Sequence, residues 1–92
     1  MGNVQRDWVV EADDKLVVGS DEALQSIVDR LPVTALLKVV DAATALDVSP
    51  SQVHNWIDSG SFQCLVIGVG DGRKHRRIIR SSFVEFLRKS LV

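Results

Sequence analysis

The sequence is poor in cysteine and contains no long apolar run, and each shortage excludes a class of protein. A single cysteine, Cys64, cannot form an internal disulfide, so a secreted scaffold held together by disulfides is excluded. No apolar run approaches the roughly 18 residues of a membrane-spanning helix, so we expect no membrane partner. The first residues, MGNVQRDWVV, lack the basic segment and the long apolar stretch of a secretory signal. Together these absences indicate a cytoplasmic protein.

Residues that carry metal or catalytic chemistry are also scarce. Two histidines and one cysteine do not form a zinc site with recognisable spacing, so we expect no metal and no cofactor. The stretch GVGDGRK resembles a phosphate-binding loop only superficially. Its interval from Gly68 to Gly72 is too short for that motif, and a strand pattern follows where a helix is required. We therefore expect that the protein is not an enzyme.

Charge is unevenly distributed along the 92 residues, although the net charge is only −1. Residues 1–30 contain three basic and seven acidic side chains (3 − 7 = −4), whereas residues 31–92 contain eight basic and five acidic ones (8 − 5 = +3). Five of those eight cations fall between residues 73 and 80. A local basic patch of this kind is typical of a surface that binds a polyanion, and a solvated turn is the simpler alternative.

The chain length suits one small domain, or a domain core with an arm. We interpret residues 1–35 as an acidic N-terminal extension, in which WVVEADDKLVV predicts one or two short strands. Apolar residues at helical spacing then predict a helix over residues 21–31. Ser20 or Asp21 is its expected cap, and Pro32 ends it because the residue before proline is pushed out of the helical region.

Residues 36–92 contain two short helical patterns that are separated by a turn. The first covers residues 39–46, and the second covers residues 50–59. The second has a specific start signal, with Ser49 as the N-cap and Pro50 as the first helical residue. It ends at a Ser-Gly pair, where glycine can take the left-handed conformation.

The spacing within this segment predicts a helix-turn-helix. Ala43 supplies the small side chain that is needed where two short helices cross closely. Four residues later, Asp47 occupies the turn position that requires a positive φ, where glycine is usual and aspartate is tolerated. Six residues further, Val53 is the branched aliphatic residue that faces the first helix. Val53, Trp56 and Ile57 then form the buried stripe of the second helix, and Trp56 is expected in the core.

A β-hairpin and a last helix are expected after the helix-turn-helix. The stretch FQCLVIGV (62–69) predicts a strand, GDGRKH predicts a tight turn, and RRII (76–79) predicts a second strand. The hairpin places residues 68–77 in the position of a wing. Ser81 or Ser82 is the expected cap of the final helix. The predicted fold class is therefore α+β, a winged helix-turn-helix with an additional N-terminal arm that contains a helix.

These motifs resemble the MerR-like winged-helix domain of phage excisionases and their small relatives. The resemblance covers residues 36–91 and is carried by Ala42-Ala43, Val48-Ser49, Trp56-Ile57, Ser59-Gly60, Gly72–Arg77 and Phe86-Leu87. It implies DNA binding, with the helix from Pro50 in the major groove and the wing near the backbone or the minor groove. It also implies DNA bending and cooperative binding at adjacent sites.

The sequence departs from this family pattern at several positions. Asp47 stands where glycine is typical, and Lys38 stands where a Ser or Thr cap opens the first helix. Asn55 and Asp58 stand in the recognition helix where family members often place a basic residue. Residues 1–35 have no counterpart in the smallest family members, which leaves open self-association or docking on a recombinase or another protein.

The motif positions give two groups of candidate DNA-binding residues. The base-reading candidates are Ser51, Gln52, His54 and Asn55, and their simpler interpretation is a polar solvent face. The phosphate-binding candidates of the wing are Arg73, Lys74, His75, Arg76 and Arg77, with Arg80 at its flank. Because successive strand residues point to opposite faces, not all of them contact one DNA surface. Arg73 and Lys74 near the tip, and one of Arg76 and Arg77, are favoured.

The sequence therefore predicts a sequence-specific protein that binds double-stranded DNA in the cytoplasm, at the nucleoid. Its expected role is that of an excisionase-like recombination directionality factor or a small transcription regulator. The alternative is a protein–protein adaptor that retains the winged-helix fold without DNA contacts. In that alternative, the acidic arm mediates self-association or partner docking. The absence of lysine and arginine from the second helix and the charge of −4 on residues 1–30 favour it.

Overall fold

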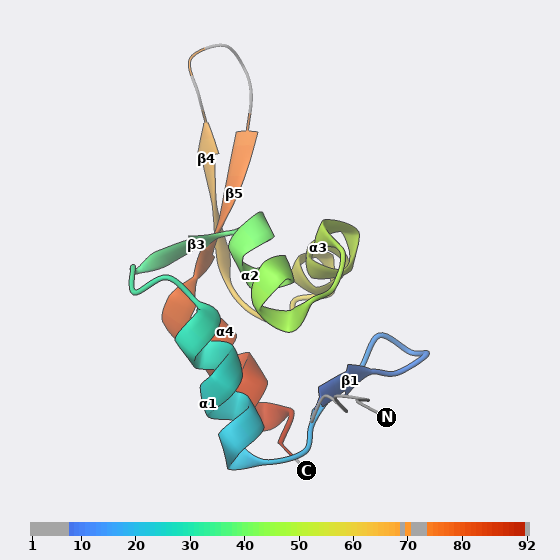
Figure 1. The fold of residues 1–92 in the computed structure, drawn as a ribbon. Coiled ribbons are helices and arrows are strands. Elements are labelled where there is room, and N and C mark those ends of the chain that lie inside the picture. Colours follow the sequence, from blue (N-terminus) through green and yellow to red (C-terminus); the bar gives the residue numbers. More distant parts are fainter. Residues whose placement is uncertain (1–7, 69, 71–73, 92) are drawn as a thin grey trace.

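The computed structural model describes residues 8–68, 70 and 74–91, and of Lys74 it describes only the backbone. The described part is α+β (Figure 1). Its elements in chain order are β1 (Trp8–Val10), β2 (Leu16–Val18), α1 (Asp21–Arg30), β3 (Leu36–Lys38), α2 (Val39–Leu46), α3 (Pro50–Asp58), β4 (Cys64–Gly68), β5 (Lys74–Ile79) and α4 (Arg80–Lys89). The succession α2, α3, β4, β5 is compatible with a helix-turn-helix followed by a hairpin wing.

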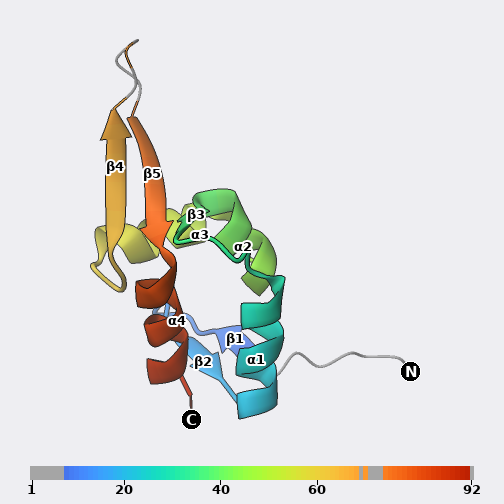
Figure 2. The same ribbon diagram turned by 90° about the vertical axis from the view of Figure 1, so that its left-hand side faces the viewer.

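The strands form two small antiparallel sheets. β1 pairs with β2, and the second sheet has the order β3-β5-β4. The β4–β5 hairpin projects beyond the helices, whereas β1, β2 and the first turn of α1 lie at the opposite end of the molecule (Figures 1 and 2). The three-residue strand β3 joins α2 to the base of the hairpin, where Leu37 is opposite Ile78. The acidic first turn of α1, with Asp21 and Glu22, therefore lies at the other end of the molecule from the basic strand β5.

The helix-turn-helix is built from the local signals that predicted it. α2 covers the expected residues, and Asp47 ends it in the left-handed conformation with φ 55°. The backbone N–H of Val48 then donates to the carbonyl of Ala43 at 2.9 Å, which closes the helix end. Ser49 Oγ accepts from the backbone N–H of Gln52 at 3.2 Å, as an N-cap does. α3 ends at Asp58, one residue before the predicted end.

The first helix is also confirmed to within one residue. Ser20 Oγ accepts from the backbone N–H of Ala23 at 3.1 Å, so Ser20 is the cap of α1. α1 ends at Arg30, and the extended residue Leu31 precedes Pro32. One or two short strands were expected before this helix, and two are present.

The start of the last helix was predicted wrongly. α4 begins at Arg80, directly from β5, and Ile79 occupies its cap position without a side-chain hydrogen bond. The backbone N–H of Arg80 donates to the carbonyl of Ala35 at 3.0 Å, so one of the unpaired N–H groups at the helix start is satisfied by the residue before β3. Ser82 Oγ instead accepts from the backbone N–H of Gln63 at 2.8 Å. The bounds of the hairpin also differ, because β4 starts at Cys64 and β5 starts at Lys74.

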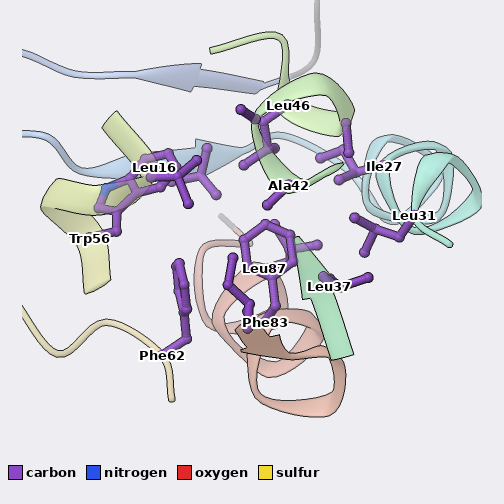
Figure 3. Packing of buried hydrophobic residues seen from close by; sticks show 14 of the residues in the cluster. Leu16, Ile27, Leu31, Leu37, Ala42, Leu46, Trp56, Phe62, Phe83 and Leu87 are labelled. Carbon is purple, nitrogen blue, oxygen red and sulfur yellow. The ribbon is translucent and has the colours of Figure 1, made fainter. Parts of the chain in front are cut away.

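One hydrophobic core joins the N-terminal residues to the helix-turn-helix (Figure 3). Its fully buried large side chains are Val18, Ile27, Leu37, Leu46, Val53, Ile78, Phe83 and Leu87. Two indole N–H groups add hydrogen bonds between the N-terminal residues and the helix-turn-helix. Trp56 Nε1 donates to the Asp14 carbonyl at 2.7 Å, and Trp8 Nε1 donates to the Leu46 carbonyl at 3.1 Å. Residues 8–30 therefore help to seat α2 and α3. The domain boundary at residue 35 stays a prediction.

Candidate nucleic-acid interface

The outward face of α3 is polar and carries no cation. Val53 and Trp56 are buried beneath it, with 0% and 2% of their surface exposed. The exposed side chains of the helix include Ser51, His54, Asn55 and Asp58. Three of the four base-reading candidates thus lie on one accessible surface, together with a carboxylate.

Gln52 differs from the other base-reading candidates. Its side chain is half-buried, and its amide nitrogen is buried without a hydrogen-bond partner among the described residues. A buried amide cannot reach a base edge without a change of rotamer. The structure therefore groups Ser51, His54 and Asn55, and it sets Gln52 apart from them.

Arg76 of β5 connects the hairpin to α3. Its Nη1 donates to Asp58 Oδ1 at 3.0 Å and lies 3.3 Å from Nδ1 of His54. His54 and Asp58 are four residues apart, so they stand on neighbouring turns of one helix face. The guanidinium of Arg76 consequently lies against the outward face of α3.

A cleft of about 470 Å³ opens between the start of α2, α3 and β5. Its lining residues are Lys38, Val39, Val40, His54, His75, Arg76 and Arg77. No carboxylate is among them, and the first two residues of α2 contribute the positive end of a helix dipole. This combination of cations, imidazoles and a helix start is suited to a phosphate backbone.

The remaining wing candidates are placed as follows. Arg73 and the side chain of Lys74 lie outside the described residues. His75 is exposed, and Arg77 is half-buried with one guanidinium nitrogen donating to the carbonyl of Arg76 at 3.1 Å. Arg80 is not brought to the cleft, because its Nε donates to the carbonyl of Pro32 at 3.1 Å near the base of the hairpin.

Sequence reasoning missed two features of this site. Lys38 was considered only as a replacement for a helix cap, yet it lines the cleft beside the start of α2. The capping function is provided by Asp41, whose carboxylate accepts from the backbone N–H of Lys38 at 3.0 Å. A cation directly before a helix start is the signal that identifies Lys38. The Arg76–Asp58 pair left no such signal, since 18 residues separate its partners.

The other strand of the hairpin, β4, has apolar side chains on its exposed surface. β4 lies at the edge of its sheet, and its middle residues Leu65, Val66 and Ile67 are exposed by 46%, 59% and 41%. An exposed apolar edge strand is a place where another chain can pair. The hairpin thus presents cations on β5 and an apolar edge on β4.

A family model described as a helix-turn-helix domain matches residues 36–90, which is more than half of the chain. The chain belongs to this helix-turn-helix domain family. The match begins at β3 and includes α2, α3, the hairpin and α4, so it covers every element that lines the cleft. Membership of the helix-turn-helix family supports a DNA-binding regulatory role in general. No curated protein and no solved structure is significantly similar to the chain.

Two further findings concern only the described part of the chain. None of its helices has the length and apolar character needed to cross a membrane. In the same residues, no group of three or more histidine, cysteine, aspartate or glutamate side chains is arranged to hold a metal ion.

Proposed function

We propose that this helix-turn-helix protein binds double-stranded DNA in a sequence-specific manner. In this proposal α3 enters the major groove, while β5 and the hairpin lie against the backbone or an adjacent minor groove. The cleft between the α2 start, α3 and β5 supports the proposal, because the polar face of α3 and the basic side chains of Lys38, Arg76 and Arg77 border it together. No enzymatic activity is part of this function.

The proposed mechanism divides affinity and specificity between two elements. Asn55 can make bidentate contacts to an adenine, and Ser51 and His54 can donate to or accept from base edges. Lys38 and Arg77 lie around the cleft and neutralise phosphates, and the imidazole of His75 can donate a hydrogen bond to one, which contributes affinity without sequence preference.

We further propose that the protein is an excisionase-like recombination directionality factor or a small transcription regulator. The resemblance of residues 36–91 to phage excisionases supports the first role. A recombinase, or further copies of this chain on adjacent DNA sites, are the partners that this role implies. The proposed location is the cytoplasm, at the nucleoid, because that is where such a protein meets its DNA.

Salt-dependent binding of the full chain to a random-sequence duplex tests the proposal. One variant replaces Lys74, Arg76 and Arg77 by alanine, and a charge-matched control replaces Lys15, Arg88 and Lys89, all of which are exposed. Each neutralised phosphate adds about −0.9 to the slope of log K against log salt, so the hairpin variant should lose most of its affinity and show a shallower slope. Equal losses in both variants, or undiminished binding by the hairpin variant, contradict the proposal.

The exposed apolar edge of β4 favours a second candidate function, that of a protein–protein adaptor. In this candidate the acidic arm or the β4 edge mediates self-association or partner docking. Light scattering of the wild type and of Val66→Lys, which places a charge on the edge, distinguishes the candidates. The adaptor is supported if wild-type protein retards no duplex at micromolar concentration in low salt yet forms oligomers that the variant does not.

A further inference from the structure

Asp58 is the only carboxylate in α3, and it stands among the side chains that would face DNA. Beside a phosphate backbone, a bare carboxylate on this face repels the ligand. In the structure it is not bare, because Arg76 Nη1 donates to its Oδ1 at 3.0 Å. One of the cations that line the cleft is therefore already neutralised by a residue of the recognition helix.

The Arg76–Asp58 pair is accessible to an incoming ligand. The Arg76 and Asp58 side chains are 36% and 62% exposed, and Arg76 also lines the cleft. A carboxylate and a phosphate offer similar paired oxygens to a guanidinium, so both compete for Arg76. Because Asp58 belongs to the same chain, it competes with phosphates for Arg76 at a high effective concentration.

We infer that Asp58 is a specificity-determining residue, which restrains binding to non-cognate DNA by withholding Arg76 from phosphates. This inference rests on the proposed function. Non-cognate binding depends on phosphate charge, so neutralising one cation of the interface within the protein weakens it directly. In the inferred cognate complex, base contacts seat α3 in the groove and Arg76 keeps the position against the α3 face that it has in the free protein, instead of moving to a phosphate. The Arg76–Asp58 pair therefore opposes the cognate complex less.

The slope of log K against log salt measures this effect, because it reports the number of phosphates contacted. Asp58→Asn should release Arg76 and make the slope on a random-sequence duplex steeper by about 0.9. If the variant and the wild type bind equally at 1 M salt, the variant should then bind roughly eightfold more tightly than the wild type at 0.1 M salt. A duplex selected from a random pool by the wild-type protein should gain less affinity. The ratio of selected to random affinity should thus fall several-fold.

Two further variants separate the pairing from a simple change in net charge. Arg76→Gln should not make the slope steeper, since the paired arginine contacts no phosphate, but the Asp58 carboxylate that it leaves unpaired should weaken binding to both duplexes. Added to Asp58→Asn, Arg76→Gln should cancel the steeper slope. Glu22→Gln removes the same charge from the first turn of α1, at the end of the molecule opposite the hairpin, and should not change the slope (Figure 2).

The outcomes distinguish this inference from the proposed function. If the wild type binds duplex DNA but Asp58→Asn alters neither slope nor affinity ratio, the inference is wrong and the proposed function stands. Equal effects of Asp58→Asn and Glu22→Gln also overturn it, because net charge alone then explains them. If neither the wild type nor Asp58→Asn binds any duplex in low salt, the proposed function itself fails.

Discussion

The helix α3 and the strand β5 border the same cleft, but α3 has polar and acidic outward side chains and β5 has basic ones. α3 presents a hydroxyl, an imidazole, an amide and a carboxylate, without lysine or arginine. β5 presents a run of basic residues, KHRR. Their only direct hydrogen bonds through described side chains run from Arg76 to Asp58 and His54. In the proposed DNA-binding surface, the groups that would read bases thus lie on a different element from the groups that supply positive charge.

Attachment to the core also distinguishes the two elements. α3 is fixed from below by Val53 and Trp56, whereas the tip-proximal part of β5 projects away from the helices (Figure 1). Disturbing the buried side chains of α3 should therefore affect stability, whereas disturbing its outward side chains or the basic side chains of β5 should affect binding alone. The following predictions test this contrast in order of decreasing effect.

Removing the indole that anchors α3 should have the largest effect. Trp56 is 2% exposed, its ring centroid lies 5.3 Å from that of Phe86, and its N–H donates to Asp14. Trp56→Ala should lower the free energy of unfolding by about 3–5 kcal/mol. Trp56→Phe retains most of the packing but leaves the Asp14 carbonyl without its donor, which costs about 1–3 kcal/mol. Urea denaturation measures both, and a loss below about 1 kcal/mol in Trp56→Ala would falsify the anchoring role.

Removing a reading group from α3 should impair specificity without altering stability. Asn55 is exposed, and a bidentate contact to a base contributes about 1–3 kcal/mol of discrimination. Asn55→Ala should therefore weaken binding to a selected duplex by about 5- to 150-fold. Fluorescence anisotropy with the selected and random duplexes checks this. A loss of the same size on both duplexes would show that Asn55 does not read bases.

Removing a cation from β5 should have the complementary effect. Arg77→Gln should reduce the salt slope by about 0.9 on selected and random duplexes alike. If the variant and the wild type bind equally at 1 M salt, the variant should bind roughly eightfold more weakly than the wild type at 0.1 M salt. Arg88→Gln, on the exposed surface of α4, is the matched control and should change neither quantity. A change in the selected-to-random ratio for Arg77→Gln would contradict the division between the two elements.

The smallest effect distinguishes two serines at the start of α3. Ser49 caps the helix, so Ser49→Ala should lower the free energy of unfolding by about 1 kcal/mol. Ser51 is exposed on the reading face, and Ser51→Ala should leave stability unchanged but weaken binding to the selected duplex. Thermal unfolding followed by circular dichroism, together with anisotropy, separates these outcomes. Equal stability losses in both variants would contradict the assignment of Ser49 as the cap.

Local signals explain why the helix-turn-helix was predictable from sequence. The positive φ of Asp47, the cap at Ser49 and the buried position of Trp56 each depend on a few neighbouring residues. β3 was not predicted, because three residues show no periodicity and their partners in β5 lie about forty positions away along the chain. The wrong cap for α4 has the same cause, since Arg80 is satisfied by Ala35 across the sheet.

The candidate site was predictable only in part. Sequence placed Ser51, Gln52, His54 and Asn55 on the outward face of α3, and the structure shows Ser51, His54 and Asn55 exposed but Gln52 half-buried. Their place beside the basic strand, and the capture of Arg76 by Asp58, depend on how α3 docks against the hairpin. Residue spacing within one element carries no information on that docking, which tertiary packing determines.

An NMR titration of the isotopically labelled full chain with a random-sequence duplex in low salt tests directly where DNA binds. We expect the amide chemical shift changes to concentrate in α3, β5 and the start of α2, and to diminish as salt is added. Changes confined to β1, β2 and α1, or none at micromolar protein and excess duplex, would contradict it.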